Sequence, residues 1–109
     1  MKQVIELHAC AVNDIPEAGA KKFCPAGKPA MALFRISGGV YATADACTHA
    51  EGSLSDGYVE GDVIVCPVHP GEFHIPTGKA CSFPAEKDLC TFPVRIADGQ
   101  VYIQIEVQA

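Results

Sequence analysis

Residues 93–107 read Pro-Val-Arg-Ile-Ala-Asp-Gly-Gln-Val-Tyr-Ile-Gln-Ile-Glu-Val. The Asp98-Gly99 pair inside this stretch is a preferred sequence for the two-residue turn that joins antiparallel strands. After the turn, apolar residues alternate with polar ones, which is the period of a strand with one buried face. The stretch therefore predicts a hairpin of residues 93–97 and 100–107. Its second strand is expected to bury one set of apolar side chains together: Val101, Ile103, Ile105 and Val107.

Outside this hairpin, further short segments are rich in apolar and β-branched residues and end at turn-forming residues. These predicted strands are residues 3–8, 30–37, 40–44, 57–59, 62–66 and 72–75. The pairs Gly38-Gly39 and Glu60-Gly61 and the triplet Pro76-Thr77-Gly78 are predicted to be turns. Residues 14–19 and 82–91 are predicted to be loops, and no segment has the pattern of a three-turn helix. The predicted fold class is therefore all-β, with antiparallel sheets.

The bulk composition limits the classes of function. A length of 109 residues suits one domain spanning residues 1–109, and a domain this small gains stability from a bound metal or another cross-link. The net charge of -5 argues against a nucleic-acid partner, which needs a basic surface. No stretch is long and apolar enough to cross a membrane, and the first residues lack the apolar run of a secretory signal. We therefore expect a cytoplasmic protein.

The chain has six cysteines, which the reducing cytoplasm would keep as thiols. Two of them stand in short motifs that also contain a histidine: Cys47-Thr48-His49 and Cys66-Pro67-Val68-His69, with sixteen residues between His49 and Cys66. This spacing lets each of two loops supply one thiolate and one imidazole to a shared site. Two thiolates and two imidazoles suit either a [2Fe–2S] cluster or a structural zinc ion.

The surroundings of both motifs resemble the Rieske ferredoxins that serve bacterial ring-hydroxylating dioxygenases. The resemblance lies in residues 47–57, in Cys66-Pro67-Val68-His69-Pro70-Gly71-Glu72-Phe73 and in Thr77-Gly78-Lys79-Ala80. It implies a small Rieske fold in which two hairpin loops hold one [2Fe–2S] cluster per chain. Cys47 and Cys66 would then bind one iron, and His49 and His69 the other. Ser82-Phe83-Pro84 resembles the third loop of such proteins, and Leu54 and Phe73 are candidates for apolar cover.

The same resemblance bears on the redox potential of the cluster. High-potential respiratory Rieske proteins have an extra cysteine in each cluster loop, joined as a disulfide, and a serine and a tyrosine that donate hydrogen bonds to the cluster. The positions that correspond to these four residues are Gly52, Val68, Gly71 and Phe73. Since none of the four can play that part, the expected potential lies near the bottom of the Rieske range.

The resemblance implies a one-electron carrier between an NAD(P)H-dependent flavoprotein reductase and a terminal Rieske non-haem iron oxygenase that hydroxylates aromatic rings. Such a carrier is not itself an enzyme and has no small-molecule substrate. Two alternatives remain open at this point: a small Rieske-like subunit of a nitrite reductase, and a structural zinc module.

The remaining residues of interest have plainer interpretations. His8 and His74 lack a cysteine at ligand spacing and are expected not to bind metal. The other cysteines are expected to be small buried apolar residues: Cys10, Cys24, Cys81 and Cys90. Several carboxylates in or beside the two motifs are candidates for a docking surface: Glu51, Asp56, Glu60 and Asp62.

Overall fold

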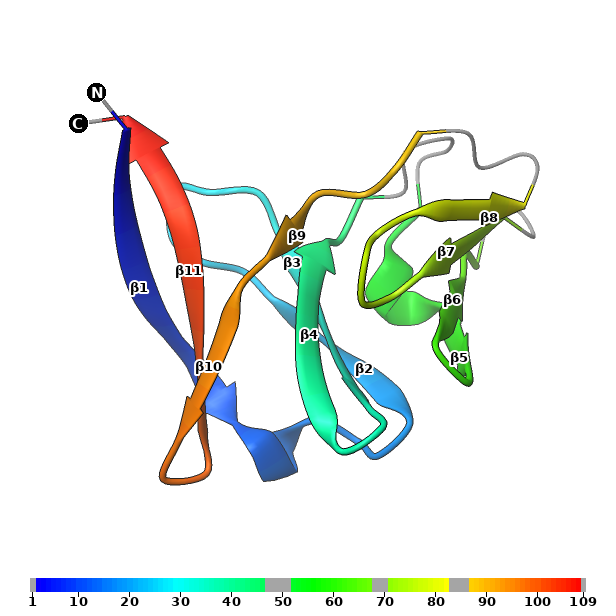
Figure 1. Cartoon of the computed structure of the whole chain (residues 1–109), viewed down its shortest axis with the longest axis horizontal. Coiled ribbons are helices and arrows are strands. Elements are labelled where there is room, and N and C mark those ends of the chain that lie inside the picture. Colours follow the sequence, from blue (N-terminus) through cyan, green and yellow to red (C-terminus); the bar gives the residue numbers. More distant parts are fainter. Residues whose placement is uncertain (1, 47–51, 68–70, 83–86, 109) are drawn as a thin grey trace.

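The structure is a computed structural model, and it describes residues 2–46, 52–67, 71–82 and 87–108. Three antiparallel sheets build the described chain, and Figure 1 shows them side by side. The first has the strand order β1-β11-β10, the second β2-β3-β4-β9 and the third β5-β6-β7-β8. The strands of the first sheet are β1 (Lys2–Ala11), β10 (Val94–Ala97) and β11 (Gln100–Gln108). Those of the second are β2 (Gly19–Phe23), β3 (Met31–Ile36), β4 (Gly39–Ala44) and β9 (Thr91–Phe92).

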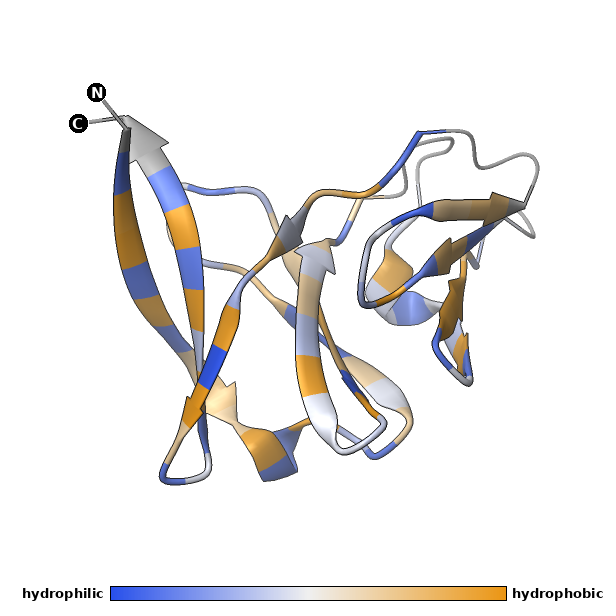
Figure 2. Ribbon diagram, in the orientation of Figure 1, coloured by the Kyte–Doolittle hydropathy of each residue, from blue (hydrophilic) through white to orange (hydrophobic). Residues whose placement is uncertain are grey.

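The first sheet confirms the hairpin predicted from residues 93–107. Strands β10 and β11 pair around Asp98 and Gly99, whose φ angles of 52° and 73° are those of a tight turn with both central residues left-handed. Val101, Ile103 and Ile105 are all buried and share one core, while the side chain of Val107 lies outside the described part. Figure 2 shows the hydrophobic and hydrophilic residues alternating along β1 and β11.

The second sheet lies between two cores because β3 is buried on both faces. Met31 and Leu33 point into the core shared with the first sheet, whereas Phe34 and Ile36 point into the core shared with the third sheet. A continuous apolar run is what a strand buried on both faces requires. The hairpin from β3 to β4 was predicted correctly, but its turn is Ser37-Gly38 rather than Gly38-Gly39, because Gly39 already pairs with Ile36.

The third sheet is small and carries the segments that flank the two motifs. Its strands are β5 (Tyr58–Glu60), β6 (Val63–Val65), β7 (Glu72–His74) and β8 (Ala80–Ser82). The turn between β5 and β6 is Gly61-Asp62 rather than Glu60-Gly61, since Glu60 pairs with Val63. One face of this sheet, with Ile64 and Phe73, packs into the core that it shares with the second sheet.

Two short 3₁₀ helices, η1 (Val12–Asp14) and η2 (Leu54–Asp56), complete the described elements. Among the described residues there is no α-helix, and no helix is long and apolar enough to cross a membrane. The predicted loops 14–19 and 82–91 are largely correct, although Gly19 begins β2, Ser82 ends β8 and Thr91 begins β9. Strand β2 was missed, because its residues Lys21 and Lys22 are exposed and polar and give no alternating pattern.

Candidate metal centre

Three connections between strands bear on the candidate centre, and we call them the first loop (residues 45–54), the second loop (66–71) and the third loop (83–89). Of the four predicted ligands, the structure describes Cys66. Cys47, His49 and His69 lie outside the described residues, as do Glu51, Val68 and Phe83. The described residues at the base of each loop nevertheless show how the loops are held together.

Cys66 follows directly after β6 and begins the second loop. Its backbone N–H donates to the carbonyl of Gly71 over 3.0 Å, which closes the base of the loop. The residue is only 3% exposed and shares a core with Leu54 and Phe73, so both expected apolar neighbours lie in the same cluster. A charged group in such surroundings is costly unless it is compensated. An oxidised [2Fe–2S] cluster with two thiolates and two neutral imidazoles has no net charge, so the donor set fits this buried position.

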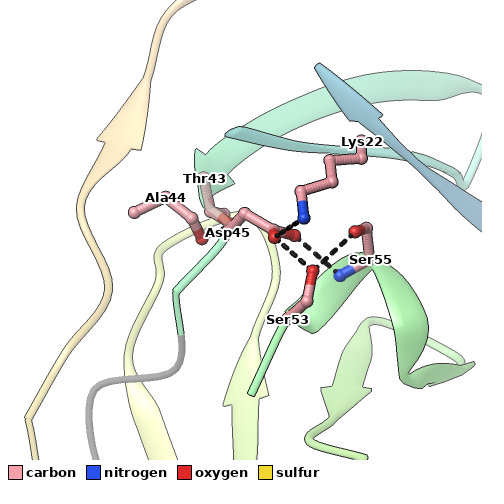
Figure 3. A network of polar contacts seen from close by, with 6 residues as sticks. All are labelled: Lys22, Thr43, Ala44, Asp45, Ser53 and Ser55. Carbon is pink, nitrogen blue, oxygen red and sulfur yellow. Dashed lines mark hydrogen bonds and ion pairs between the residues drawn. The ribbon is translucent and has the colours of Figure 1, made fainter. Parts of the chain in front are cut away.

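The first loop is closed at its base by Asp45, which directly follows β4 and Ala44 (Figure 3). One carboxylate oxygen, Oδ1, accepts the backbone N–H of Ser55 over 2.8 Å, and the other, Oδ2, accepts the hydroxyl of Ser53. The carbonyl of Asp45 accepts the N–H of Leu54 over 2.8 Å. Asp45 thereby joins the start of the first loop to its end, across the segment that contains Cys47 and His49.

The carboxylate of Asp45 is held in its ionised form. Burial by itself would raise its pKa, but the hydrogen bonds from Ser53 and Ser55 and the charge of Lys22 lower the pKa below the ordinary value of 3.8. Sequence reasoning missed Asp45, because a single aspartate before a cysteine has no motif of its own. The available signal was an acidic residue directly after an apolar strand and two residues before a candidate ligand.

Gly57 fixes the first loop against the second. A Cβ atom on this residue would lie 2.1 Å from the carbonyl oxygen of Val65 and 3.2 Å from that of Leu54. Only a glycine permits this close approach of two backbones. The end of the first loop is therefore packed directly against the strand that leads into Cys66.

The third loop is closed in a similar way. The N–H of Leu89 donates to the carbonyl of Gly78 over 2.7 Å, and the side chain of Asp88 accepts the N–H of Ala80 over 2.9 Å. Gly78 has a φ of 74°, and a Cβ there would meet the Leu89 carbonyl at 2.5 Å. Leu89 packs into the same core as Leu54 and Cys66, so the bases of all three loops meet in one apolar cluster.

The structure corrects one prediction about the remaining cysteines. Cys10 is buried as expected, but Cys24, Cys81 and Cys90 are exposed free thiols. Cys24 directly follows β2, Cys81 lies on the three-residue strand β8 and Cys90 directly precedes β9, so none of them lies inside a long buried strand. His74 lies on β7 as expected, and its Nδ1 is 2.9 Å from the hydroxyl of Thr77.

Comparison with known proteins gives a consistent result. The model of the Rieske [2Fe-2S] domain family matches residues 6–93. The 3-phenylpropionate/cinnamic acid dioxygenase ferredoxin subunit of Escherichia coli is 40% identical over 100 residues, which cover 91% of this chain and 92% of that protein. The ferredoxin component of the naphthalene 1,2-dioxygenase/salicylate 5-hydroxylase systems of Ralstonia is also 40% identical over 100 residues, with 92% and 95% covered.

Solved structures show the same fold. A Sphingomonas yanoikuyae ferredoxin superposes with a TM-score of 0.87 at 37% identity, covering 91% of this chain and 97% of that one. A chain from the complex of reduced oxygenase and oxidized ferredoxin in carbazole 1,9a-dioxygenase gives 0.86 at 38% identity, with 91% and 92% covered. The family model and relatives of nearly equal length agree with the loop geometry: this chain belongs to the Rieske [2Fe–2S] domain family, whose cofactor is a [2Fe–2S] cluster.

Proposed function

We propose that this protein is the ferredoxin of an aromatic-ring-hydroxylating dioxygenase system. It would carry single electrons from an NAD(P)H-dependent flavoprotein reductase to a terminal Rieske non-haem iron oxygenase. The observation that carries this proposal is the 40% identity to two dioxygenase ferredoxins over more than nine-tenths of the chain. Both relatives are named as ferredoxins, so the chain is an electron carrier and the oxygenase performs the chemistry.

Four residues are proposed to hold the cluster: Cys47, His49, Cys66 and His69. When bound, the cluster supplies reversible one-electron redox chemistry. The protein's own contribution is to fix the ligands, and the closed bases of the first and second loops support this role. The burial of Cys66 supports the assignment of Cys47 and Cys66 to an inner iron and of the two histidines to an outer one, nearer the partner.

The whole chain, residues 1–109, is proposed to form one domain that works in the cytoplasm. Two cores that share strand β3 support a single folding unit. Three exposed free thiols, at Cys24, Cys81 and Cys90, are suited to a reducing compartment.

The alternative of a nitrite reductase subunit has weaker support. The small subunit of a putative NADH-dependent nitrite reductase from Mycobacterium tuberculosis superposes with a TM-score of 0.84 but is only 18% identical, which shows a shared fold alone. The alternative of a structural zinc module does not agree with membership of a [2Fe–2S] family.

The proposal is tested by reconstitution with a dioxygenase reductase and oxygenase of a ring-hydroxylating system. We expect the purified protein to show the electron paramagnetic resonance signal of a reduced [2Fe–2S] cluster and to support NADH-dependent ring hydroxylation. His69→Ala should abolish the signal, whereas His74→Ala, which removes a histidine bonded to Thr77, should retain it. A colourless protein, or electron transfer only to a nitrite reductase, would overturn the proposal.

A further inference from the structure

The base of the first loop contains an ion pair between β2, an edge strand of the second sheet, and the residue that directly follows β4 of the same sheet. Lys22 lies on β2 and its Nζ is 3.6 Å from Oδ2 of Asp45 (Figure 3). The lysine side chain is 49% exposed, whereas that of Asp45 is only 4% exposed. Strand β2 also packs against η2, where the first loop ends. The pair therefore connects an edge strand, the start of the loop and the end of the loop.

Asp45 replaces a missing helix cap. Ser53 precedes η2 but makes no side-chain cap, so the N–H of Ser55 has no acceptor within its own segment. The Asp45 carboxylate supplies that acceptor from the other side of the loop. The backbone N–H of Asp45 is also satisfied, since it donates to the carbonyl of Ala30 over 3.1 Å. Such a satisfied and buried carboxylate has one orientation, and its charge is fixed in place.

We propose that Asp45 is a positioning residue for the ligand-bearing first loop, and that the opposite charges of Asp45 and Lys22 set the redox potential of the cluster. This inference rests on the proposed ligands, because Asp45 stands two residues before Cys47. Reduction adds one negative charge to the cluster. The buried carboxylate opposes that step, since water screens it little, and the half-exposed lysine favours the step more weakly.

Substitutions can separate position from charge. In Asp45→Asn the amide oxygen still accepts from the N–H of Ser55, and the amide nitrogen can donate to the hydroxyl of Ser53 in place of the bond that Asp45 accepts from it. The loop contacts are then kept while the charge is lost. In Asp45→Ala both the charge and the loop contacts are lost. Lys22→Gln removes the positive charge from a half-exposed side chain and should leave the fold intact. Glu17→Gln is the matched control, because Glu17 forms an ion pair with Arg35 at 3.5 Å near the other end of β3.

The experiment is a redox titration of each holo-protein, followed by its electron paramagnetic resonance spectrum. Relative to the wild type and to Glu17→Gln, we expect Asp45→Asn to move the midpoint potential upward and Lys22→Gln to move it downward. The downward shift should shrink at high salt, because Lys22 is partly exposed. We expect Asp45→Ala to change the shape of the spectrum or reduce the cluster content, and Asp45→Asn to restore both.

The outcomes distinguish this inference from the proposed function. Shifts of the same sign in Asp45→Asn and Lys22→Gln, or shifts no larger than that of Glu17→Gln, overturn the role of the charges. A normal spectrum and full cluster content in Asp45→Ala overturn the positioning role. Both results leave the ferredoxin proposal intact, whereas a wild-type protein without a [2Fe–2S] signal removes both proposals.

Discussion

Gly57 leaves no room for a larger side chain. Its neighbour is the backbone oxygen of Val65, which cannot rotate away as the end of a side chain would. We therefore expect Gly57→Ala to lower the free energy of unfolding by about 1–3 kcal/mol and to reduce cluster retention, because the strand before Cys66 must shift. Urea unfolding and the iron content per chain measure the two effects.

The control for this substitution is Gly39→Ala. A Cβ on Gly39 would make only ordinary contacts with the ring of Tyr41, the nearest at 3.6 Å, and the residue pairs in a regular strand. Its unfolding free energy should change by less than about 0.5 kcal/mol. Equal losses in both variants would show that glycine flexibility, and not the close approach to Val65, determines the effect.

Two described residues bear on the redox potential. Phe73 is fully buried in the core that contains Cys66, and its ring has no hydroxyl to donate a hydrogen bond. Gly71 has no side chain at all. Since hydrogen bonds to the cluster raise the potential of a Rieske centre, we expect a midpoint of about −150 mV, at the bottom of the Rieske range. A redox titration that gives a clearly positive midpoint would contradict this expectation.

The thiols differ in exposure and hence in reactivity. Burial raises the pKa of Cys10 above its ordinary value of 9.0, and the nearby charge of Asp14 raises it further. A raised pKa means less thiolate at pH 8, and the thiolate is the reactive form. We expect iodoacetamide to modify Cys24 and Cys90 at least ~10-fold faster than Cys10, as measured by mass spectrometry. Similar rates for Cys10 and Cys24 would refute the difference.

At the scale of elements, the two hairpin turns differ in how well their first residue suits a left-handed conformation. Ser37-Gly38 and Asp98-Gly99 both have positive φ at both residues, but serine is a poorer residue than asparagine or aspartate in a left-handed conformation. Ser37→Asn should therefore raise the free energy of unfolding by roughly 0.5 kcal/mol, and its amide can still donate to Asp62 as the serine hydroxyl does. Thermal unfolding measures the change. The reverse substitution, Asp98→Ser, should lower stability, and a gain there would contradict the argument.

The sequence was sufficient for the elements that have a strong local pattern. Alternation in β11 and the Asp98-Gly99 turn predicted the terminal hairpin, because side-chain burial and turn geometry are both local properties. Strand β2 was not predictable in this way, since it lies at the edge of its sheet and its lysines face solvent. Its position depends on pairing with β3, and this pairing leaves no pattern in the local sequence.

The same distinction between local patterns and distant contacts applies to the candidate centre. The spacing of Cys47, His49, Cys66 and His69 is visible in the sequence because ligands come in short motifs. The supports at Asp45 and Gly57 are not visible, because they act through contacts between segments that are distant in the chain. The exposure of Cys24, Cys81 and Cys90 was mispredicted for a related reason: burial depends on what packs against a residue.

At the scale of the whole molecule, the three sheets enclose two hydrophobic cores. The first and second sheets enclose one core, and the second and third sheets enclose the other. Strand β3 belongs to both cores, so the third sheet and its loops rest on a strand that is buried on either face. A buried base of this kind suits the proposed ligand loops, because a site is positioned more precisely when the elements that support it are themselves packed.

Exposed carboxylates on and beside the third sheet are candidates for a docking surface. Asp56 and Glu60 are exposed, and they lie on η2 and β5 beside the two cluster loops, with the exposed ring of Tyr58 between them in sequence. If these carboxylates guide a basic partner surface, the double variant Asp56→Asn/Glu60→Gln should lower the association rate with the oxygenase several-fold at low salt. It should also flatten the salt dependence of that rate, because fewer charges remain to be screened. Stopped-flow electron transfer over a range of ionic strength measures both quantities.

The matched control changes the net charge equally at other places. Asp14→Asn/Asp98→Asn removes two exposed carboxylates from η1 and from the turn between β10 and β11, which meet where the N–H of Val12 donates to the carbonyl of Gly99 beside the first sheet. Since attraction at a docking surface depends on where the charges lie, this variant should retain most of the wild-type rate and its salt dependence. If both double variants slow association equally, the net charge of the chain steers the encounter, and the carboxylates of the third sheet have no special part in it.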